Sequence, residues 1–327
     1  MPSKPYIKYF LLTALAVLLG LCLWINLVDL SHQRVILSRF KPERRIALEN
    51  PGGKEATPAI PRADQPLPEL RVAIAPIFSP EVSLRLYKDI VDCLGHKLGM
   101  KTVIMQRGTY AEINELLRDK ICQIAFVCTF PFIRGEQDFG MELLAVPQIR
   151  GKTTFNALII VNRTSPARTL LDLQGKKFAT ADIFSSTGWL YPATWLAERG
   201  KNPKAFFSSL VITGSHDGSI AAVSNGYAEG ASVNSMVFDQ MVFEDSSLLG
   251  KLRVIQHSPD YGAPPVVVYP QLDAALKARI AEALFRMDEE PEGKQALKKP
   301  RIDKYVKPEE KWYGSVREAV KLFEAHQ

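Results

Sequence analysis

Hydroxyl residues and glycine gather at two places where a predicted strand gives way to a helix. The run Ser185–Gly188 follows the predicted strand 177–181, and the run Ser215–Asp217 follows the predicted strand 210–213. A helix start offers free backbone N–H groups and the positive end of the helix dipole, and hydroxyl side chains add donors. Such junctions can bind an oxyanion without Lys or Arg. The same residue types are ordinary helix caps, so each junction alone leaves both interpretations open.

Familiar catalytic patterns are absent from the sequence. Gly151-Lys152-Thr153 resembles the end of a phosphate-binding P-loop, but Val146 stands where that loop needs its first glycine. The five histidines form no H-E-x-x-H pair, so we expect neither a zinc site nor another cofactor. An enzyme that uses a serine with His216 and Asp217 is a minor alternative, because adjacent His and Asp rarely form a triad. We therefore expect a protein that is not an enzyme.

The four cysteines are not spaced as a metal site. They are Cys22, Cys93, Cys122 and Cys128, and no C-x-x-C pair occurs. Small buried residues are the favoured interpretation. A disulfide between Cys122 and Cys128 stays open at this point.

The segments that must position these residues alternate between strands and helices. A strand is predicted at 70–75, a helix from Pro80 to Gly99, a strand at 102–105, a helix capped by Thr109 and a strand at 121–127. This βαβαβ order is typical of an α/β fold with a parallel sheet. Further strands are predicted at 157–161, 177–181, 210–213 and 266–269, with a helix at 272–287. About 255 residues of such alternation favour two α/β lobes.

Composition and charge exclude several classes of protein. The chain has 327 residues, of which 46% are hydrophobic and 23% charged, as in a globular protein with a sizeable core. A multi-span transporter is excluded because only one long apolar run exists. The net charge is +6, and residues 1–71 carry ten basic and six acidic side chains. The rest of the chain is nearly neutral, which argues against nucleic-acid binding.

The N-terminus predicts a membrane anchor. The run Tyr9–Val28 is interrupted only by Asn26 and is long enough to cross a bilayer. No small-x-small cleavage site follows it, so an uncleaved signal anchor is predicted over residues 1–30. A basic juxtamembrane segment and a Pro-rich linker make up residues 31–69. The basic residues after the span conflict with an external folded part under the positive-inside rule.

Five short motifs, in order, resemble the phosphate/phosphite/phosphonate substrate-binding proteins of ABC transporters. The resemblance covers roughly residues 70–290. The motifs are Gly108–Ala111, Ile124–Thr129, Asp182–Gly188, Ser215–Val223 and Gly262–Val268. Each motif is weak alone, and their common order makes the resemblance fairly specific.

The resemblance implies a two-lobed type II periplasmic-binding-protein fold on the extracytoplasmic side of the inner membrane, preceded by one transmembrane helix. It implies a first lobe of residues 70–155 plus 256–327 and a second lobe of residues 156–255. Phe132 lies near a position where a tyrosine is usual. Asn234 stands near the position where relatives that bind aminophosphonates have carboxylates, which argues against a cationic group on the ligand. The implied ligand-binding residues are Tyr110, Phe132, Ser185, Ser186, Thr187, His216 and Asn234.

The implied function is the capture of a phosphate-like oxyanion (phosphate, phosphite or phosphonate) between the lobes for an ABC permease. A membrane-tethered sensing domain that reports oxyanion binding to a separate signalling partner is the alternative. Small-ligand binding, a membrane partner and no nucleic acid are expected in both cases.

Overall fold

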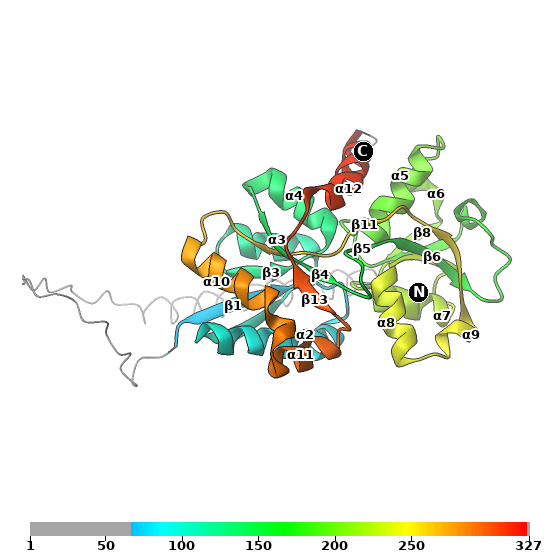
Figure 1. The fold of residues 1–327 in the computed structure, drawn as a ribbon. Coiled ribbons are helices and arrows are strands. Elements are labelled where there is room, and N and C mark those ends of the chain that lie inside the picture. Colours follow the sequence, from blue (N-terminus) through cyan, green and yellow to red (C-terminus); the bar gives the residue numbers. More distant parts are fainter. Residues whose placement is uncertain (1–66, 326–327) are drawn as a thin grey trace, which may run out of the picture. The chain divides into compact units, whose positions relative to one another are not determined.

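The computed structural model describes residues 67–325, which fold around two main β-sheets (Figure 1). The predicted anchor 1–30 and most of the segment 31–69 lie outside the described residues. Among residues 67–325, no helix is both long and apolar enough to cross a membrane.

The first sheet has six strands in the order β13-β4-β12-β3-β1-β2. β1 pairs in parallel with both β2 and β3, which confirms the predicted βαβαβ opening. β12 returns from late in the chain and pairs antiparallel with β3 and β4. The strand bounds are β1 Glu69–Ile74, β2 Lys101–Gln106, β3 Ile124–Phe126, β4 Glu142–Gln148, β12 Val266–Val268 and β13 Lys304–Val306.

Five helices accompany this sheet and form the first lobe with it. α2 begins at Pro80 after Ser79 and ends at Gly99, whose left-handed φ of 65° suits glycine, as the sequence predicts. α2, α10 and α11 share one buried apolar cluster with the sheet, including Ile90, Leu94 and Leu284. The bounds are α2 Pro80–Leu98, α3 Tyr110–Arg118, α4 Thr129–Phe139, α10 Ala274–Phe285 and α11 Pro291–Lys298.

The second sheet has five strands in the order β10-β6-β9-β7-β8 and carries the second lobe. β7 is parallel to β8 and β9, while β6 is antiparallel to β9 and β10. Its strands are β6 Ala157–Asn162, β7 Lys177–Thr180, β8 Ser209–Ile212, β9 Gly230–Asn234 and β10 Leu252–His257. Its helical segments are η1 Leu170–Leu173, η2 Ser186–Leu190, α5 Tyr191–Ala197, α6 Pro203–Phe206, α7 His216–Ser224, α8 Ser235–Glu244 and α9 Leu248–Lys251.

Two short strands mark the places where the chain crosses between the lobes. β5 (Thr154–Phe155) pairs with β11 (Tyr261–Gly262) in a two-stranded ribbon. The chain ends with η3 (Met287–Glu289), η4 (Glu310–Tyr313) and α12 (Gly314–Ala325). α12 contacts α4 of the first lobe and α5 and η2 of the second, between which Figure 1 shows it.

The structure corrects two local expectations and decides one alternative that the sequence leaves open. The predicted strand 121–127 is reduced to Ile124–Phe126, because Ile121 is still held by α3 through its N–H bond to the Leu116 carbonyl. The helix expected after Ser185 starts as one π-helical turn before α5. The disulfide between Cys122 and Cys128 is not formed, because both thiols are free and buried.

Candidate functional site

Five strand-to-helix junctions bring polar residues together where the lobes meet. Parallel strands place their carboxyl ends at one edge of a sheet, so the helix starts that follow them converge. Tyr110 and Cys128 stand at the starts of α3 and α4, and Ser185, His216 and Asn234 stand at the starts of η2, α7 and α8. The exposed fraction of each is 0%. The junctions therefore form one enclosed polar cluster.

His216 is held as a neutral hydrogen-bond donor. Its Nδ1 accepts the backbone N–H of Asn234 at 3.3 Å, so the ring proton must be on Nε2. Nε2 lies 3.1 Å from Ser185 Oγ and 3.4 Å from Thr187 Oγ1. Burial lowers the pKa of His216 to about 3, and the nearby Asp217 only partly opposes that shift. The imidazole therefore stays uncharged and donates through Nε2 near neutral pH.

Three hydroxyls next to His216 keep their own protons available. Ser185 Oγ accepts the Gly188 N–H at 3.0 Å in addition to the His216 proton. Ser186 Oγ accepts the Phe130 N–H from the other lobe at 2.7 Å. Thr187 Oγ1 shares the proton on His216 Nε2. Because each oxygen already accepts a hydrogen bond from the protein, each hydroxyl has a proton to donate to a bound anion; for Ser186, Cys128 Sγ at 3.5 Å is an alternative acceptor.

Two further polar atoms in the cluster have no partner among the described residues. They are the Tyr110 hydroxyl and the Asn234 Nδ2 amide. Asn234 Oδ1 accepts the N–H groups of Met236 at 2.8 Å and Val237 at 3.4 Å, which fixes the amide and leaves its NH₂ free. Burial raises the pKa of Tyr110 well above its usual value, and the nearby Ser185 side chain partly opposes that shift. Buried polar groups without partners are rare and mark places where a ligand is expected.

Carboxylates from the second lobe occupy helix starts of the first. Asp182 Oδ2 accepts the Tyr110 N–H at 3.1 Å, and its Oδ1 accepts the Phe184 N–H at 2.7 Å. Asp217 Oδ1 accepts the Ser79 N–H at 2.8 Å. Beside it, the His216 N–H donates to the Ile77 carbonyl at 3.0 Å. These contacts hold the two lobes together around the cluster.

The structure brings together six of the seven residues predicted for the site. Phe132 lies elsewhere in α4: its ring packs edge-on against Tyr313 with 5.2 Å between centroids, and the Arg317 guanidinium lies 5.9 Å away. Sequence reasoning missed Cys128, whose Sγ lies 3.5 Å from Ser186 Oγ, and the backbone N–H of Phe130. It also assigned no role to Asp182 and considered Asp217 only as a catalytic partner of His216, although both belong to the motifs that it singled out. Contacts between lobes have no local sequence signal.

The arrangement excludes a catalytic relay through His216 and Asp217. A triad needs a carboxylate that accepts a proton from His Nδ1. Here Nδ1 is itself an acceptor from Asn234, and the Asp217 carboxylate bonds to Ser79. The cluster is suited to hold an anion with uncharged donors.

Comparison with known proteins identifies relatives of this chain. A family model described as "ABC transporter, phosphonate, periplasmic substrate-binding protein" matches residues 72–313. The "Phosphonates-binding periplasmic protein" of Escherichia coli (strain K12) is 25% identical over 208 residues, which is 62% of this chain. That match spans 61% of the relative, less than two thirds of its length.

Solved structures share the fold at lower identity. A binding protein component of an ABC phosphonate transporter from Pseudomonas aeruginosa superimposes with a TM-score of 0.74 at 19% identity, covering 80% of this chain and 88% of that one. PhnD1 from Prochlorococcus marinus, in complex with methylphosphonate, gives 0.70 at 18% identity, with coverages of 78% and 98%. These likenesses show that the described residues have the two-lobed α/β fold of periplasmic binding proteins.

Proposed function

Because the chain belongs to the family of periplasmic phosphonate-binding proteins of ABC transporters, we propose that it captures a phosphonate or a related phosphate-like oxyanion outside the cytoplasm. The bound ligand would pass to a membrane permease, as the name of the family describes. Binding and closure, without a chemical step on the ligand, are the proposed mechanism.

The observation that carries this proposal is the set of uncharged donors around His216. The hydroxyls of Ser185, Ser186 and Thr187 already accept from protein groups and so have protons to donate. The Tyr110 hydroxyl and the Asn234 amide add two donors without partners. The oxygens of a tetrahedral anion can accept hydrogen bonds from several of these donors at once. A hydrogen bond to a charged partner contributes about 1.5–3 kcal/mol, so a few of them suffice for tight binding.

The same donors favour certain ligands over others. The carboxylates Asp182 and Asp217 accept from backbone N–H groups, which uses part of their capacity to hold an ammonium group. Asn234 presents an NH₂ donor, which repels an ammonium and suits an oxygen. We therefore propose that phosphate, phosphite and phosphonates without an amino group bind better than aminophosphonates.

Closure of the two lobes would exclude water and strengthen each hydrogen bond to the anion. We assign residues 70–155 plus 256–327 to the first lobe and residues 156–255 to the second. The two sheets support this division, since every strand from β6 to β10 belongs to the second sheet. The ribbon of β5 and β11 would then be the hinge.

We further propose that the run Tyr9–Val28 anchors the protein in the inner membrane with the folded part outside. The length and apolar character of the run support an anchor. The relatives are named as periplasmic proteins of transporters, which favours an external location and transport over a role as a tethered sensor.

Native mass spectrometry and calorimetry on the full-length chain test the proposal. Phosphate, phosphite, methylphosphonate and 2-aminoethylphosphonate should be compared at constant ionic strength. We expect at least one of the first three to bind and the amine to bind more weakly. Binding of none of the four would contradict the assigned function, and preference for the amine would contradict the role given to Asn234.

A further inference from the structure

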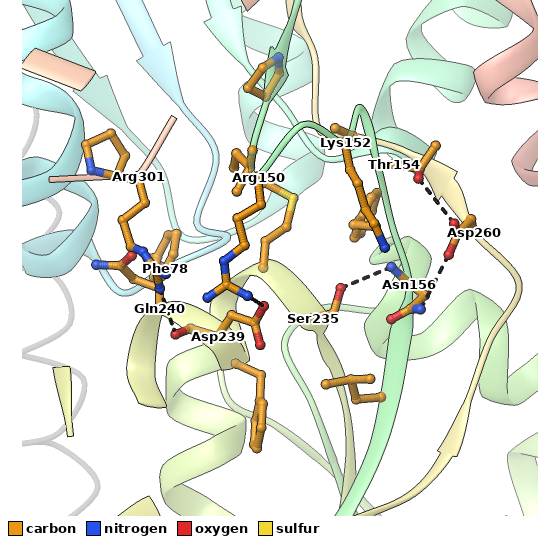
Figure 2. Close-up of a pocket in the computed structure, with 18 of the residues that line it drawn as sticks. Phe78, Arg150, Lys152, Thr154, Asn156, Ser235, Asp239, Gln240, Asp260 and Arg301 are labelled. Carbon is orange, nitrogen blue, oxygen red and sulfur yellow. Dashed lines mark hydrogen bonds and ion pairs between the residues drawn. The ribbon is translucent and has the colours of Figure 1, made fainter. Parts of the chain in front are cut away.

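A cavity of about 410 Å³ is lined by residues of both lobes (Figure 2). Phe78 and Arg301 of the first lobe line it, and Ser235 and Asp239 of α8 line it from the second. The segment 149–156, which crosses between the lobes, closes a further side. Its volume lies within the range of small-molecule sites.

At two places, consecutive residues belong to the donor cluster and to the cavity wall. Ser235 on the cavity wall directly follows Asn234, whose NH₂ has no partner. Phe78 directly follows Ile77, whose carbonyl accepts the His216 N–H. Along the chain, the cavity wall therefore begins one residue away from two groups of the cluster.

Three cationic side chains line the cavity, against the two carboxylates of Asp239 and Asp260. The cations are Arg150, Lys152 and Arg301. Arg150 pairs with Asp239 at 2.9 Å, and the Asp260 carboxylate lies 3.2 Å from Thr154 Oγ1. The Lys152 ammonium has no carboxylate partner among residues 67–325, and Figure 2 shows it directed into the cavity beside Arg150. Exposed charges without partners are common, but this ammonium lies at the wall of a cavity lined by both lobes.

Backbone conformation sets the same wall apart. Three residues other than glycine have positive φ in the described chain, and two of them, Arg150 (52°) and Arg301 (57°), line this cavity. The left-handed region is unfavourable for such residues, and departures of this kind cluster at ligand sites. Arg301 also donates to the Asp239 carbonyl at 3.3 Å, so both arginines converge on one turn of α8.

The inner wall is apolar. Phe155, Leu158 and Phe238 are buried residues that line the cavity together with the charged groups. An occupant is therefore expected to have a short hydrocarbon body and an anionic end. Hydrocarbon would cover the aromatic wall, while the anion would lie at Lys152.

We propose that this cavity receives the organic substituent of the bound phosphonate, and that the preferred ligands are phosphonates whose short substituent ends in a carboxylate paired with Lys152. This inference rests on the proposed function, since it needs a phosphonate group in the donor cluster.

The test compares three phosphonates by calorimetry on the full-length chain. Methylphosphonate carries only a methyl group, propylphosphonate supplies a longer hydrocarbon chain, and 3-phosphonopropionate adds the carboxylate. We expect 3-phosphonopropionate to bind about two- to fivefold more tightly than propylphosphonate, the size of an exposed ion pair. Lys152→Met should remove that difference and leave methylphosphonate binding unchanged.

Lys101→Met is the matched control, because Lys101 is also exposed and starts β2 away from the cavity. It should retain the preference. If methylphosphonate binds but the carboxylate gives no gain, or if both lysine variants lose the gain equally, the inference is wrong while the proposed function stands. If none of the three binds, the assigned function fails and the inference fails with it.

Discussion

The Asp217 carboxylate accepts a hydrogen bond at 2.8 Å from the backbone N–H of Ser79, across the boundary between the lobes. Ser79 is the N-cap of α2, and its own side chain forms no capping hydrogen bond. Asp217 therefore supplies a negative charge to a helix start that lacks a local cap, which is favourable for both groups. The contact depends on the lobes being close together, so it links helix capping to closure.

Asp217→Asn should favour a more open protein. The amide keeps the shape but removes the charge from the contact with Ser79, so the closed arrangement loses about 0.5–2 kcal/mol. We expect a larger radius of gyration in small-angle X-ray scattering without ligand, and several-fold weaker binding. Asp245→Asn is the control, because Asp245 bonds only locally to Ser247. Unchanged scattering and affinity would mean that Asp217 does not hold the lobes.

Thr187→Val should weaken anion binding by about ten- to a hundredfold, the effect of one charge-assisted hydrogen bond. Stability should change by about 1 kcal/mol or less, because among the described residues the one polar contact of the Thr187 side chain is the 3.4 Å approach to His216. Calorimetry and thermal unfolding measure the two effects. Thr194→Val, a buried threonine in α5 that bonds to the Leu190 carbonyl, should not change affinity. An unfolded Thr187→Val would indicate a purely structural hydroxyl.

Acid should destabilise the fold through His216. Its pKa is about 3 when folded and about 6.5 when unfolded, so the unfolded chain binds more protons between those values. The free energy of unfolding should therefore fall as pH drops from about 6.5 towards 3. His216→Gln should make that dependence shallower in denaturant titrations. An equally steep dependence in the variant would mean that His216 is already protonated in the fold.

Gly188→Ala should disturb the hydroxyl cluster. A Cβ at this position would lie 2.7 Å from Thr180 Oγ1 and 3.0 Å from Ser185 Oγ, so the start of η2 must shift. We expect a loss of about 1–3 kcal/mol in stability together with weaker anion binding. Gly250→Ala in α9 is the control, because a Cβ added there has no atom within 4 Å. This substitution should be neutral or slightly stabilising. Equal effects of the two substitutions would show that the crowding at 188 is relieved without cost.

A phosphatase fusion tests the orientation of the chain. Alkaline phosphatase attached after Gln327 should be active, because the folded part is proposed to lie outside the cytoplasm. The basic residues after the apolar run predict the reverse under the positive-inside rule. An inactive phosphatase fusion with an active cytoplasmic reporter at the same site would establish that reverse orientation.

Local patterns predicted the elements and the cap residues well. Ser185 and Ser215 do cap their helices, accepting the N–H groups of Gly188 and Gly218. The capping interpretation and the anion-binding interpretation are thus compatible for Ser185, because a hydroxyl can accept from the backbone while it donates elsewhere. Helix starts are recognisable in sequence because capping needs only residues within one turn.

Contacts between distant segments could not be predicted from the residues alone. The bond from Asn234 to His216, which sets the tautomer, joins the starts of α8 and α7, and the bond from Phe130 to Ser186 joins the two lobes. Neither hydrogen bond is indicated by the periodicity or the spacing of residues in the sequence. Phe132 was assigned by resemblance, and the structure places its ring against Tyr313, in packing that no motif encodes.

The strand β12 has a consequence for how the chain folds. It pairs with β3 and β4 in the interior of the first sheet, yet it follows the whole second lobe in the sequence. During synthesis, the second sheet is complete once residue 257 has emerged, whereas the first still has an unfilled gap beside β3. The first lobe, whose sheet begins with the N-terminal strands, is thus the last to be completed. The anion site, which needs both lobes, can form only after the chain is nearly complete.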